Sequence, residues 1–323
     1  MKKSTLAKVS AIIVTVILLT ILFTQINLSD VINTLLKINP VYLLVGFLLY
    51  TASYFFRALR FYILLNHDVC MRDLFQIVCL HNMMNYVLPA RTGELSYVYL
   101  LKKTNGRATG EGIATLVVAR IFDFIIIVIL FLISVFLVNN VPSYVVDLIL
   151  IIASFMLVLV ILLGLMLYYG QKSLNLLNYI MGVFHITQSN FGEYIFNKCK
   201  ETVDCLENLR SSKKIYLKLF LCSLGIWLML YSMNYSLIVA MGISIGFITV
   251  IFASTFAVFT TVLPIQGVGG FGTLEAGWTI GFVAAGLSTD IAISSGFSYH
   301  IVILLYAFVF GVFGLLRLKN IYI

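Results

Sequence analysis

The sequence has 323 residues, of which 61% are hydrophobic and only 11% are charged. Soluble domains average about 45–50% apolar and about 25% charged residues, so this composition excludes a water-soluble protein and predicts an integral membrane protein with several spans. The formal net charge is +8, but the Lys and Arg residues cluster in short segments between apolar runs. That distribution is typical of the cytoplasmic loops of membrane proteins, and we therefore expect no nucleic-acid partner.

Six uncharged or nearly uncharged runs are long enough to cross a bilayer as helices. They cover residues 8–26, 41–65, 112–139, 144–169, 215–240 and 291–317. The first run follows Lys2, Lys3 and Lys8, as in a signal peptide, but no small-residue cleavage site comes after it. We therefore expect this run to be a retained first helix.

The positive residues predict which side of the membrane each loop faces. Lys and Arg occur before residue 9, at the end of the second run, in the connector 170–214 and near the C-terminus. They are absent from 139–146 and 241–250. By the positive-inside rule, both termini and the connector lie in the cytoplasm of a multi-pass protein, which we expect in the plasma membrane.

Two stretches, 73–101 and 246–288, do not fit simple spans. Pro89 breaks the first stretch, and Pro264 with the glycines after it breaks the second. The predicted orientation requires each stretch to return to the side from which it came, so we expect re-entrant hairpins or full spans broken midway. Such irregular backbone is tolerated in a membrane only where protein buries it or water reaches it.

The two halves of the chain resemble each other. Each half contains V-L-P followed by Gly and Glu, in VLPARTGEL (87–95) and in VLPIQGVGGFGTLEAG (262–277). In each half, two predicted helices precede this stretch and a third follows it. Because the halves enter the membrane from opposite sides, this pattern predicts an inverted-topology repeat. We expect an all-α polytopic membrane protein with about six full spans and two hairpins, in a single domain (1–323) with repeats over about 1–140 and 144–320.

The second hairpin contains a glycine motif. Gly267, Gly269 and Gly272 match the G-x-G-x-x-G of dinucleotide-binding proteins, and Asp290 follows 18 residues beyond. That fingerprint requires a strand and a helix of a soluble βαβ unit, whereas no charged residue occurs from residue 219 to residue 274. We therefore reject the nucleotide interpretation in favour of a broken membrane helix.

In a broken helix, the second half begins near Thr273. Its first N–H groups have no intrahelical partner, and its dipole is positive at that end. Gly269, Gly270 and Gly272 would then bring the chain close to an anionic group of a substrate. The alternative is that these glycines allow close helix packing, and both interpretations stay open.

Glu275 is the charged residue that the break places inside the membrane. A carboxylate there is costly unless it is paired, protonated or hydrated, so Glu275 is a candidate substrate-binding or proton-carrying residue. Its alternative role is that of an N-terminal cap of the second half-helix. Asp290 falls at a predicted outer end, where we expect water to solvate it.

The first hairpin supplies Arg91, Glu94 and Asn85. A guanidinium presents a planar fork of donors that suits a phosphate, so Arg91 is a candidate phosphate ligand. An internal ion pair of Arg91 with Glu94 or Glu275 is the alternative. Asn85 lies four residues before Pro89 and could line the same cavity, and we expect His81 to serve packing or hydrogen bonding.

Two further pairs of charged residues lie on predicted spans. Arg120 and Asp123 are three residues apart and share a helix face, which favours a structural ion pair over a share in the site. Arg57 and Arg60 share a face near the cytoplasmic end of their helix, where we expect them to reach the lipid headgroups.

Three motifs together resemble a known family. They are NYVLPARTGE (85–94), ARIFD (119–123) and the pattern P-x-x-G-x-G-G-x-G-x-x-E (264–275). This set is similar to the lysylphosphatidylglycerol synthase transmembrane-region family, also called flippase-like domain proteins, over nearly the whole chain. The resemblance implies a polytopic helical fold with re-entrant elements. The best-understood members move aminoacylated phosphatidylglycerol between leaflets, and other relatives are linked to lipid-carrier glycan pathways.

The resemblance carries over to single residues. The positions that match the family's motifs are Arg91, Glu94, Arg120, Asp123 and Glu275. Many relatives have an acidic residue where this chain has Ala119, so any role of that acid is absent. Bifunctional members carry a soluble aminoacyl-transferase domain after the membrane region, and we expect no lysyl transfer by that route from this sequence.

Three functions remain open on these grounds. A flippase-like transporter would bind an anionic phospholipid or a polyprenyl-linked glycan between the two hairpins and expose it to each leaflet in turn. An integral-membrane lipid-modifying enzyme or glycosyltransferase accessory is the second, although no D-x-D or H-E-x-x-H motif occurs. A carrier for a small soluble solute is the third. We expect neither metal nor cofactor, and a homodimer is possible.

Overall fold

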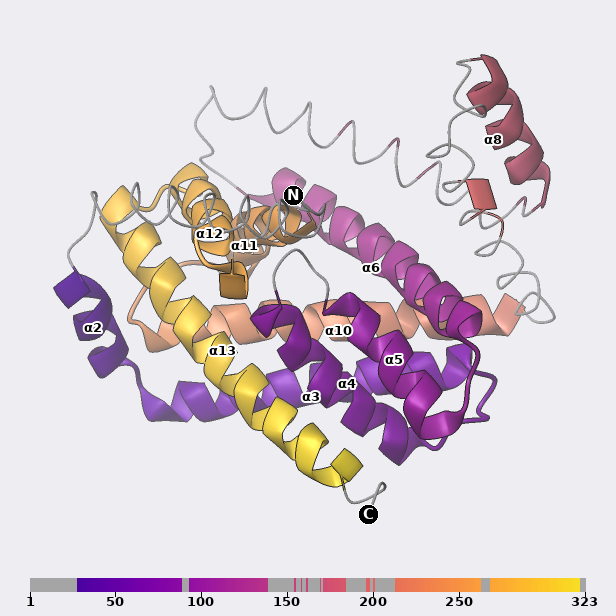
Figure 1. Cartoon of the computed structure of the whole chain (residues 1–323). Coiled ribbons are helices and arrows are strands. Elements are labelled where there is room, and N and C mark those ends of the chain that lie inside the picture. The colour runs from indigo at the N-terminus through magenta and orange to yellow at the C-terminus, as the bar shows by residue number, and fades with distance from the viewer. Residues whose placement is uncertain are drawn as a thin grey trace, which may run out of the picture.

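Helices and no strands make up the regular secondary structure in the part of the chain that the structure describes. The computed structural model (Figure 1) describes residues 28–88, 93–138, 171–183, 213–262 and 268–319, and single positions between 154 and 200. The helices are α2 (Leu28–Lys37), α3 (Pro40–Leu64), α4 (Met71–Val87), α5 (Glu94–Asn105), α6 (Thr109–Leu137), α8 (Gln171–Val183), α10 (Lys213–Ala240), α11 (Phe247–Val262), the short η3 (Val268–Gly270), α12 (Thr273–Ala284) and α13 (Thr289–Lys319).

Four of these helices are long and apolar enough to cross a membrane. They are α3, α6, α10 and α13, and they confirm the spans predicted at 41–65, 112–139, 215–240 and 291–317. The spans predicted at 8–26 and 144–169 lie outside the described residues, apart from single positions of the second. Helix α2 was not predicted, and its Val31 packs against Ile293 and Phe297 of α13.

The broken stretches fold into two helical hairpins. Helices α4 and α5 have 17 and 12 residues, and α11 and α12 have 16 and 12. Each is shorter than the ~20 residues that a full span needs. This geometry suits the re-entrant hairpins that the orientation predicts.

Glycines hold the second hairpin closed. A Cβ on Gly281 would collide with the carbonyl oxygen of Ala253, and one on Gly277 would lie 2.7 Å from the Thr260 side chain. The two helices therefore touch through backbone, as small residues allow in membrane proteins.

Helices α3 and α10 lie side by side at the centre of the fold (Figure 1) and run antiparallel. The start of α3 meets the end of α10, because the Asn39 N–H donates to the Ala240 carbonyl at 3.2 Å. The Ser236 hydroxyl of α10 donates to the Tyr42 carbonyl of α3 at 2.9 Å. Helix α13 packs on α4, and α6 packs on α10 and α11. The segments 1–140 and 144–320 thus contact each other along these helices.

Candidate functional site: a polar cavity between the two halves

A cavity of about 190 Å³ lies where the hairpins meet the central helices. Its walls come from α3, α4, α5 and α6 on one side and from α10, α11, η3, α12 and α13 on the other, so both halves of the chain contribute. The polar and aromatic lining residues are Tyr50, Tyr54, Arg57, Asn82, Asn85, Tyr86, Glu94, Arg120, Trp227, Tyr231, Asn234, Ser254, Thr273, Trp278 and Tyr299.

Several buried polar atoms of this lining have no hydrogen-bond partner within the described chain. They are Asn82 Nδ2, Asn85 Oδ1, Asn234 Oδ1, and the Nε atoms of Arg57 and Arg120. A buried polar atom without a partner costs about 1–3 kcal/mol, so such a group in a native protein calls for water or a ligand. The atoms supply both donors and acceptors, which suits a ligand that itself carries both.

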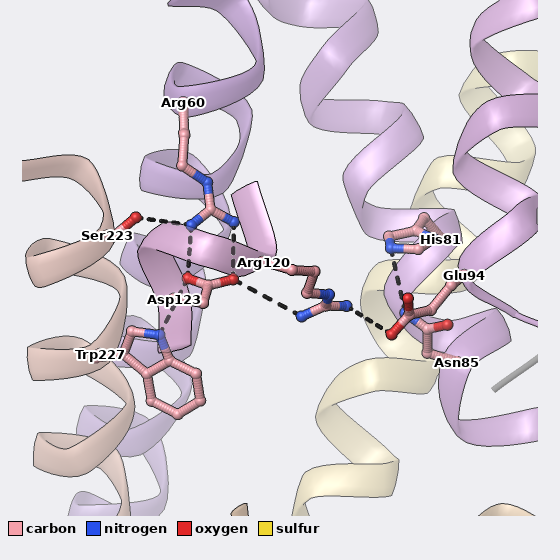
Figure 2. A network of polar contacts seen from close by, with 8 residues as sticks. All are labelled: Arg60, His81, Asn85, Glu94, Arg120, Asp123, Ser223 and Trp227. Atoms are coloured by element: carbon pink, nitrogen blue, oxygen red, sulfur yellow. Dashed lines mark hydrogen bonds and ion pairs between the residues drawn. The ribbon is translucent and has the colours of Figure 1, made fainter. Parts of the chain in front are cut away.

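Beside the cavity, Arg60 and Asp123 form a buried two-point ion pair, shown in Figure 2. Arg60 Nη1 lies 2.5 Å from Asp123 Oδ1 and Nη2 lies 3.0 Å from Oδ2. Arg60 Nη1 also donates to the Ser223 hydroxyl at 2.8 Å, and Trp227 Nε1 donates to Asp123 Oδ1 at 3.0 Å. Helices α3, α6 and α10 are therefore joined at one point. Arg60 is only 2% exposed, so the expectation that it reaches the lipid headgroups is wrong.

Arg120 connects this ion pair to the first hairpin (Figure 2). Its Nη2 lies 3.1 Å from Glu94 Oε1 at the start of α5, and its Nη1 lies 3.7 Å from Asp123 Oδ2. The predicted contact between Arg120 and Asp123 is thus present, but Asp123 makes its shorter bonds to Arg60. The Arg120 side chain is 37% exposed and lines the cavity, which leaves part of its charge open to a ligand.

Arg57 gives the site an excess of positive charge. It lies three residues before Arg60 on α3 and lines the cavity, which overturns the expectation that it too reaches the headgroups. Arg57, Arg60 and Arg120 together face the carboxylates Glu94 and Asp123, so one positive charge is left over among these described residues. A positive charge that is removed from bulk water needs an anion or bound water to offset its desolvation.

The first hairpin is braced by a chain of hydrogen bonds. Asn85 Nδ2 lies 3.2 Å from His81 Nε2, and His81 Nδ1 lies 3.1 Å from the Ser96 hydroxyl. The Ser96 hydroxyl donates to the Gly93 carbonyl at 2.5 Å. Because the Asn85 amide nitrogen can only donate, His81 Nε2 accepts and Nδ1 carries the hydrogen. His81 therefore has the hydrogen-bonding role that was expected of it, and it fixes the Asn85 side chain at the cavity wall.

The second hairpin breaks at residues with left-handed backbone. The φ angles of Gly269, Gly270 and Gly272 are 68°, 78° and 84°, which glycine adopts without steric cost. Helix α12 begins at Thr273, as predicted, and Gly270 and Thr273 both line the cavity. The positive end of the α12 dipole thus lies at the cavity wall.

Glu275 is fully buried, with its carboxylate held on both sides. The Gly272 N–H donates to Glu275 Oε2 at 2.7 Å, which is the capping role considered as the alternative. His300 Nδ1 of α13 lies 2.6 Å from Glu275 Oε1. The carboxylate therefore ties the start of α12 to the middle of α13, away from the cavity surface.

Hydrogen-bond chemistry assigns a proton to this Glu–His pair. His300 Nε2 lies 3.0 Å from the Gly269 carbonyl oxygen, which can only accept, so Nε2 carries a hydrogen. The contact between Nδ1 and Oε1 requires a second hydrogen, either on His300 or on Glu275. The pair therefore carries no net charge, which reduces the cost of burying it.

The structure places the predicted site residues differently. Asn85, Glu94, Arg120 and Gly270 line the cavity. Asp123 lies behind it in the arginine network, and Gly269, Gly272 and Glu275 form the break and its cap. Arg91, which was predicted to bind phosphate, lies outside the described residues.

Sequence reasoning missed Arg57 as a residue that lines the cavity and His300 as the partner of Glu275. Both lie within predicted spans, about two turns from a helix end for Arg57 and near the middle of α13 for His300. The depth of an ionisable residue in an apolar run is itself a signal of a functional or paired group, and it was available for both.

Comparison with known proteins identifies the family. The search of curated proteins gives no match. The family model described as lysylphosphatidylglycerol synthase TM region matches residues 8–311, which is nearly the whole chain. The match includes both hairpins, the spans α3, α6 and α10 and most of α13, and it associates the chain with membrane lipids. The protein therefore belongs to the lysylphosphatidylglycerol synthase TM region family.

Proposed function

We propose that the protein is a flippase-like transporter that binds the phosphate of an anionic lipid headgroup in the central cavity and moves the lipid between leaflets. The observation that carries this proposal is the excess positive charge of Arg57 in a cavity walled by both halves of the chain. Family membership supports a role with membrane lipids.

Arg57 and Arg120 are the proposed phosphate ligands. Each has a buried Nε without a partner in the described chain, and arginine presents its donors in a fork that fits phosphate oxygens. The N-terminal end of α12 adds a positive dipole at the cavity wall. Arg91 is a further candidate ligand, as its motif position indicates.

The unpaired amide atoms favour a headgroup with hydroxyls next to the phosphate. Asn85 Oδ1 and Asn234 Oδ1 need donors, and Asn82 Nδ2 needs an acceptor. A hydroxyl group supplies both functions, so a glycerol phosphate or a sugar phosphate fits this lining better than a bare phosphate. The acyl or polyprenyl chain would stay in the bilayer, where burial of the apolar chain costs nothing.

The two halves of the chain would move against each other to open the cavity to each leaflet in turn. In transporters built from inverted repeats, one half rocks against the other around a site near the bilayer midplane. Here the halves meet along α3–α10 and α4–α13, and the cavity is walled by residues of both.

The alternative functions make different demands on the cavity. An enzyme needs a free acid or base, whereas Glu94 and Asp123 both contact arginine. A carrier of soluble solutes would move a free sugar phosphate and leave lipids in place. Transport measurements with lipid and soluble probes in the same vesicles therefore separate the three functions.

The test is a transport assay in proteoliposomes that contain fluorescent phosphatidylglycerol or fluorescent phosphatidylcholine. The account predicts faster exposure of phosphatidylglycerol to an external quencher with wild type than with empty vesicles. Arg57→Gln should slow this at least about ten-fold, since a charge-assisted hydrogen bond contributes about 1.5–3 kcal/mol. Lys102→Gln, on the exposed face of α5, is the matched control and should match wild type.

Two results would contradict the proposal. One is equal rates for Arg57→Gln and wild type. The other is transport of glycerol 3-phosphate by wild type without any movement of lipid, which would identify a carrier of soluble solutes.

A further inference from the structure

A second recess lies on the outside of the helix bundle, apart from the central cavity. It is a groove of about 530 Å³, which we call the α4–α13 groove, lined by Phe55, Met71, Arg72, Phe75, Gln76, Phe313 and Arg317. None of these residues lines the central cavity. The groove therefore needs its own explanation.

The groove combines apolar walls with positive charge. Its walls are aromatic, with the Phe75 and Phe313 rings in edge contact at 6.3 Å and Phe55 51% exposed. Its charge comes from Arg72 at the start of α4 and Arg317 in the last turns of α13. Apolar walls with a charged end match the shape of a phospholipid, whose acyl chains follow the headgroup.

The two arginines have no acidic partner within the described chain. Arg317 only lies over the Phe313 ring, at 5.8 Å, and the described lining contains no carboxylate. The nearest acid on α4, Asp73, accepts a hydrogen bond from Asn105 of α5 at 3.4 Å. The groove therefore carries two positive charges that are not neutralised by these residues.

The start of α4 adds to this anionic preference. Cys70 precedes the helix without a side-chain cap. The Asp73 N–H donates to the Cys70 carbonyl at 3.1 Å, which leaves the N–H groups of Met71 and Arg72 at the start of the helix without an intrahelical partner. Arg72 lies in that first turn, where a cation is unfavourable against the helix dipole. A phosphate at this position would satisfy the N–H groups and the arginine together.

Gln76 distinguishes among anionic headgroups. It is only 2% exposed, and its Oε1 is buried without a hydrogen-bond partner. Gly314 brings α13 against the backbone of Gln76, so α4 and α13 are closely packed beside this side chain. Because Oε1 can only accept, it needs a donor from the ligand, such as a headgroup hydroxyl.

We infer that the α4–α13 groove is a binding site for an anionic glycerophospholipid whose headgroup carries a hydroxyl donor. Arg72, Arg317 and the start of α4 bind its phosphate, Gln76 accepts from its headgroup, and the three phenylalanines contact its acyl chains. The positive-inside pattern places Arg72 and Arg317 on the cytoplasmic side, where basic pockets between membrane helices bind anionic headgroups. This site does not depend on the proposed transport.

A photo-crosslink at the groove tests the site directly. A benzoylphenylalanine at Phe55 reports lipids in the groove, and one at Leu221, which is exposed on α10, reports bulk lipid. The protein is illuminated in vesicles of phosphatidylglycerol and phosphatidylcholine in equal amounts, and adducts are counted by intact mass. The account predicts about thirty-fold enrichment of phosphatidylglycerol at position 55 over position 221, since two arginines contribute about 1 kcal/mol each.

Variants assign that enrichment to the arginines. The double substitution R72Q/R317Q should abolish it, whereas K102Q/K103Q, which removes the same charge from α5, should preserve it. Both arginines are exposed, so the fold should tolerate the change. Equal enrichment at positions 55 and 221, or unchanged enrichment in R72Q/R317Q, would overturn the inference.

Gln76 is tested by a lipid of the same charge without a headgroup donor. Wild type should prefer phosphatidylglycerol to phosphatidylmethanol about ten-fold at position 55, because the latter leaves Oε1 unsatisfied. Gln76→Met keeps the side-chain length and removes the acceptor, so this preference should disappear. A wild type that does not distinguish the two lipids would refute the proposed role of Gln76.

Discussion

Arg60 of α3 and Asp123 of α6, which are 63 residues apart in the sequence, meet in a two-point ion pair that is almost completely buried. The pair lies beside the cavity and is completed by Ser223 and Trp227 of α10. It thus joins both halves of the chain at the wall of the proposed lipid site. Asp123 Oδ2 also lies 3.7 Å from Arg120 Nη1, so the pair is linked to one of the cavity-lining arginines.

Removing one partner of this pair should destabilise the protein strongly. Asp123→Ala leaves the Arg60 guanidinium buried without its carboxylate, which costs about 3–5 kcal/mol. The double variant Arg60→Met/Asp123→Leu removes both charges and should recover most of that loss. Thermal unfolding in detergent measures both, and an Asp123→Ala variant as stable as wild type would contradict the assignment.

The Glu275–His300 pair should tolerate a neutral amide better than loss of one partner. Glu275→Gln keeps an oxygen for the Gly272 N–H and a donor for His300 Nδ1, so we expect a loss of less than about 2 kcal/mol. His300→Phe leaves a carboxylate buried without its partner and should cost about 3–5 kcal/mol. The same unfolding assay compares them, and the reverse order of stability would show that the pair does not share a proton.

A single methyl group should open the second hairpin. In Gly281→Ala, the new Cβ meets the Ala253 carbonyl, so the helices must separate at a cost of about 1–3 kcal/mol. Gly110→Ala is the matched control, because open space surrounds that position at the start of α6. It should be neutral or stabilise by about 0.4–1 kcal/mol. Equal melting temperatures for the two variants would argue against close packing of α11 on α12.

Arg57 should behave as a binding residue and not as a structural one. In the described chain, Glu94 contacts Arg120 and Asp123 contacts Arg60, so Arg57→Met breaks no ion pair. The free energy of unfolding should therefore change by less than about 1 kcal/mol. Retention of anionic lipid should fall at least about ten-fold. A large loss of stability with unchanged lipid retention would make Arg57 a part of the scaffold instead.

The sequence predicts the spans and the break well, and the side-chain partners poorly. Apolar runs and their lengths locate α3, α6, α10 and α13, and glycines followed by a carboxylate locate the start of α12 at Thr273. These features depend on neighbouring residues, which the sequence displays directly. The arrangement of the hairpins as paired short helices also follows from Pro89, Pro264 and the charge pattern.

The networks depend on residues that are distant in the sequence. Arg60 reaches Asp123 and Ser223 only after α3, α6 and α10 have packed, and His300 reaches Glu275 across 25 residues. No local pattern gives these pairings, and the cytoplasmic end of α3 suggested headgroup contact for Arg57 and Arg60 instead. The one available signal was their depth in an apolar run. Helix α2 was missed because its ten residues are too few for a span.

The central claim is that the cavity beside Arg57 holds one anionic headgroup, and lipid retention tests it most directly. Native mass spectrometry of the R72Q/R317Q protein, purified with phosphatidylglycerol, counts the bound lipids after the two arginines of the α4–α13 groove have been removed. The account predicts one retained lipid, which is lost when Arg57→Gln is added and kept when Lys102→Gln is added. A retained lipid in all three proteins, or in none, would contradict the claim.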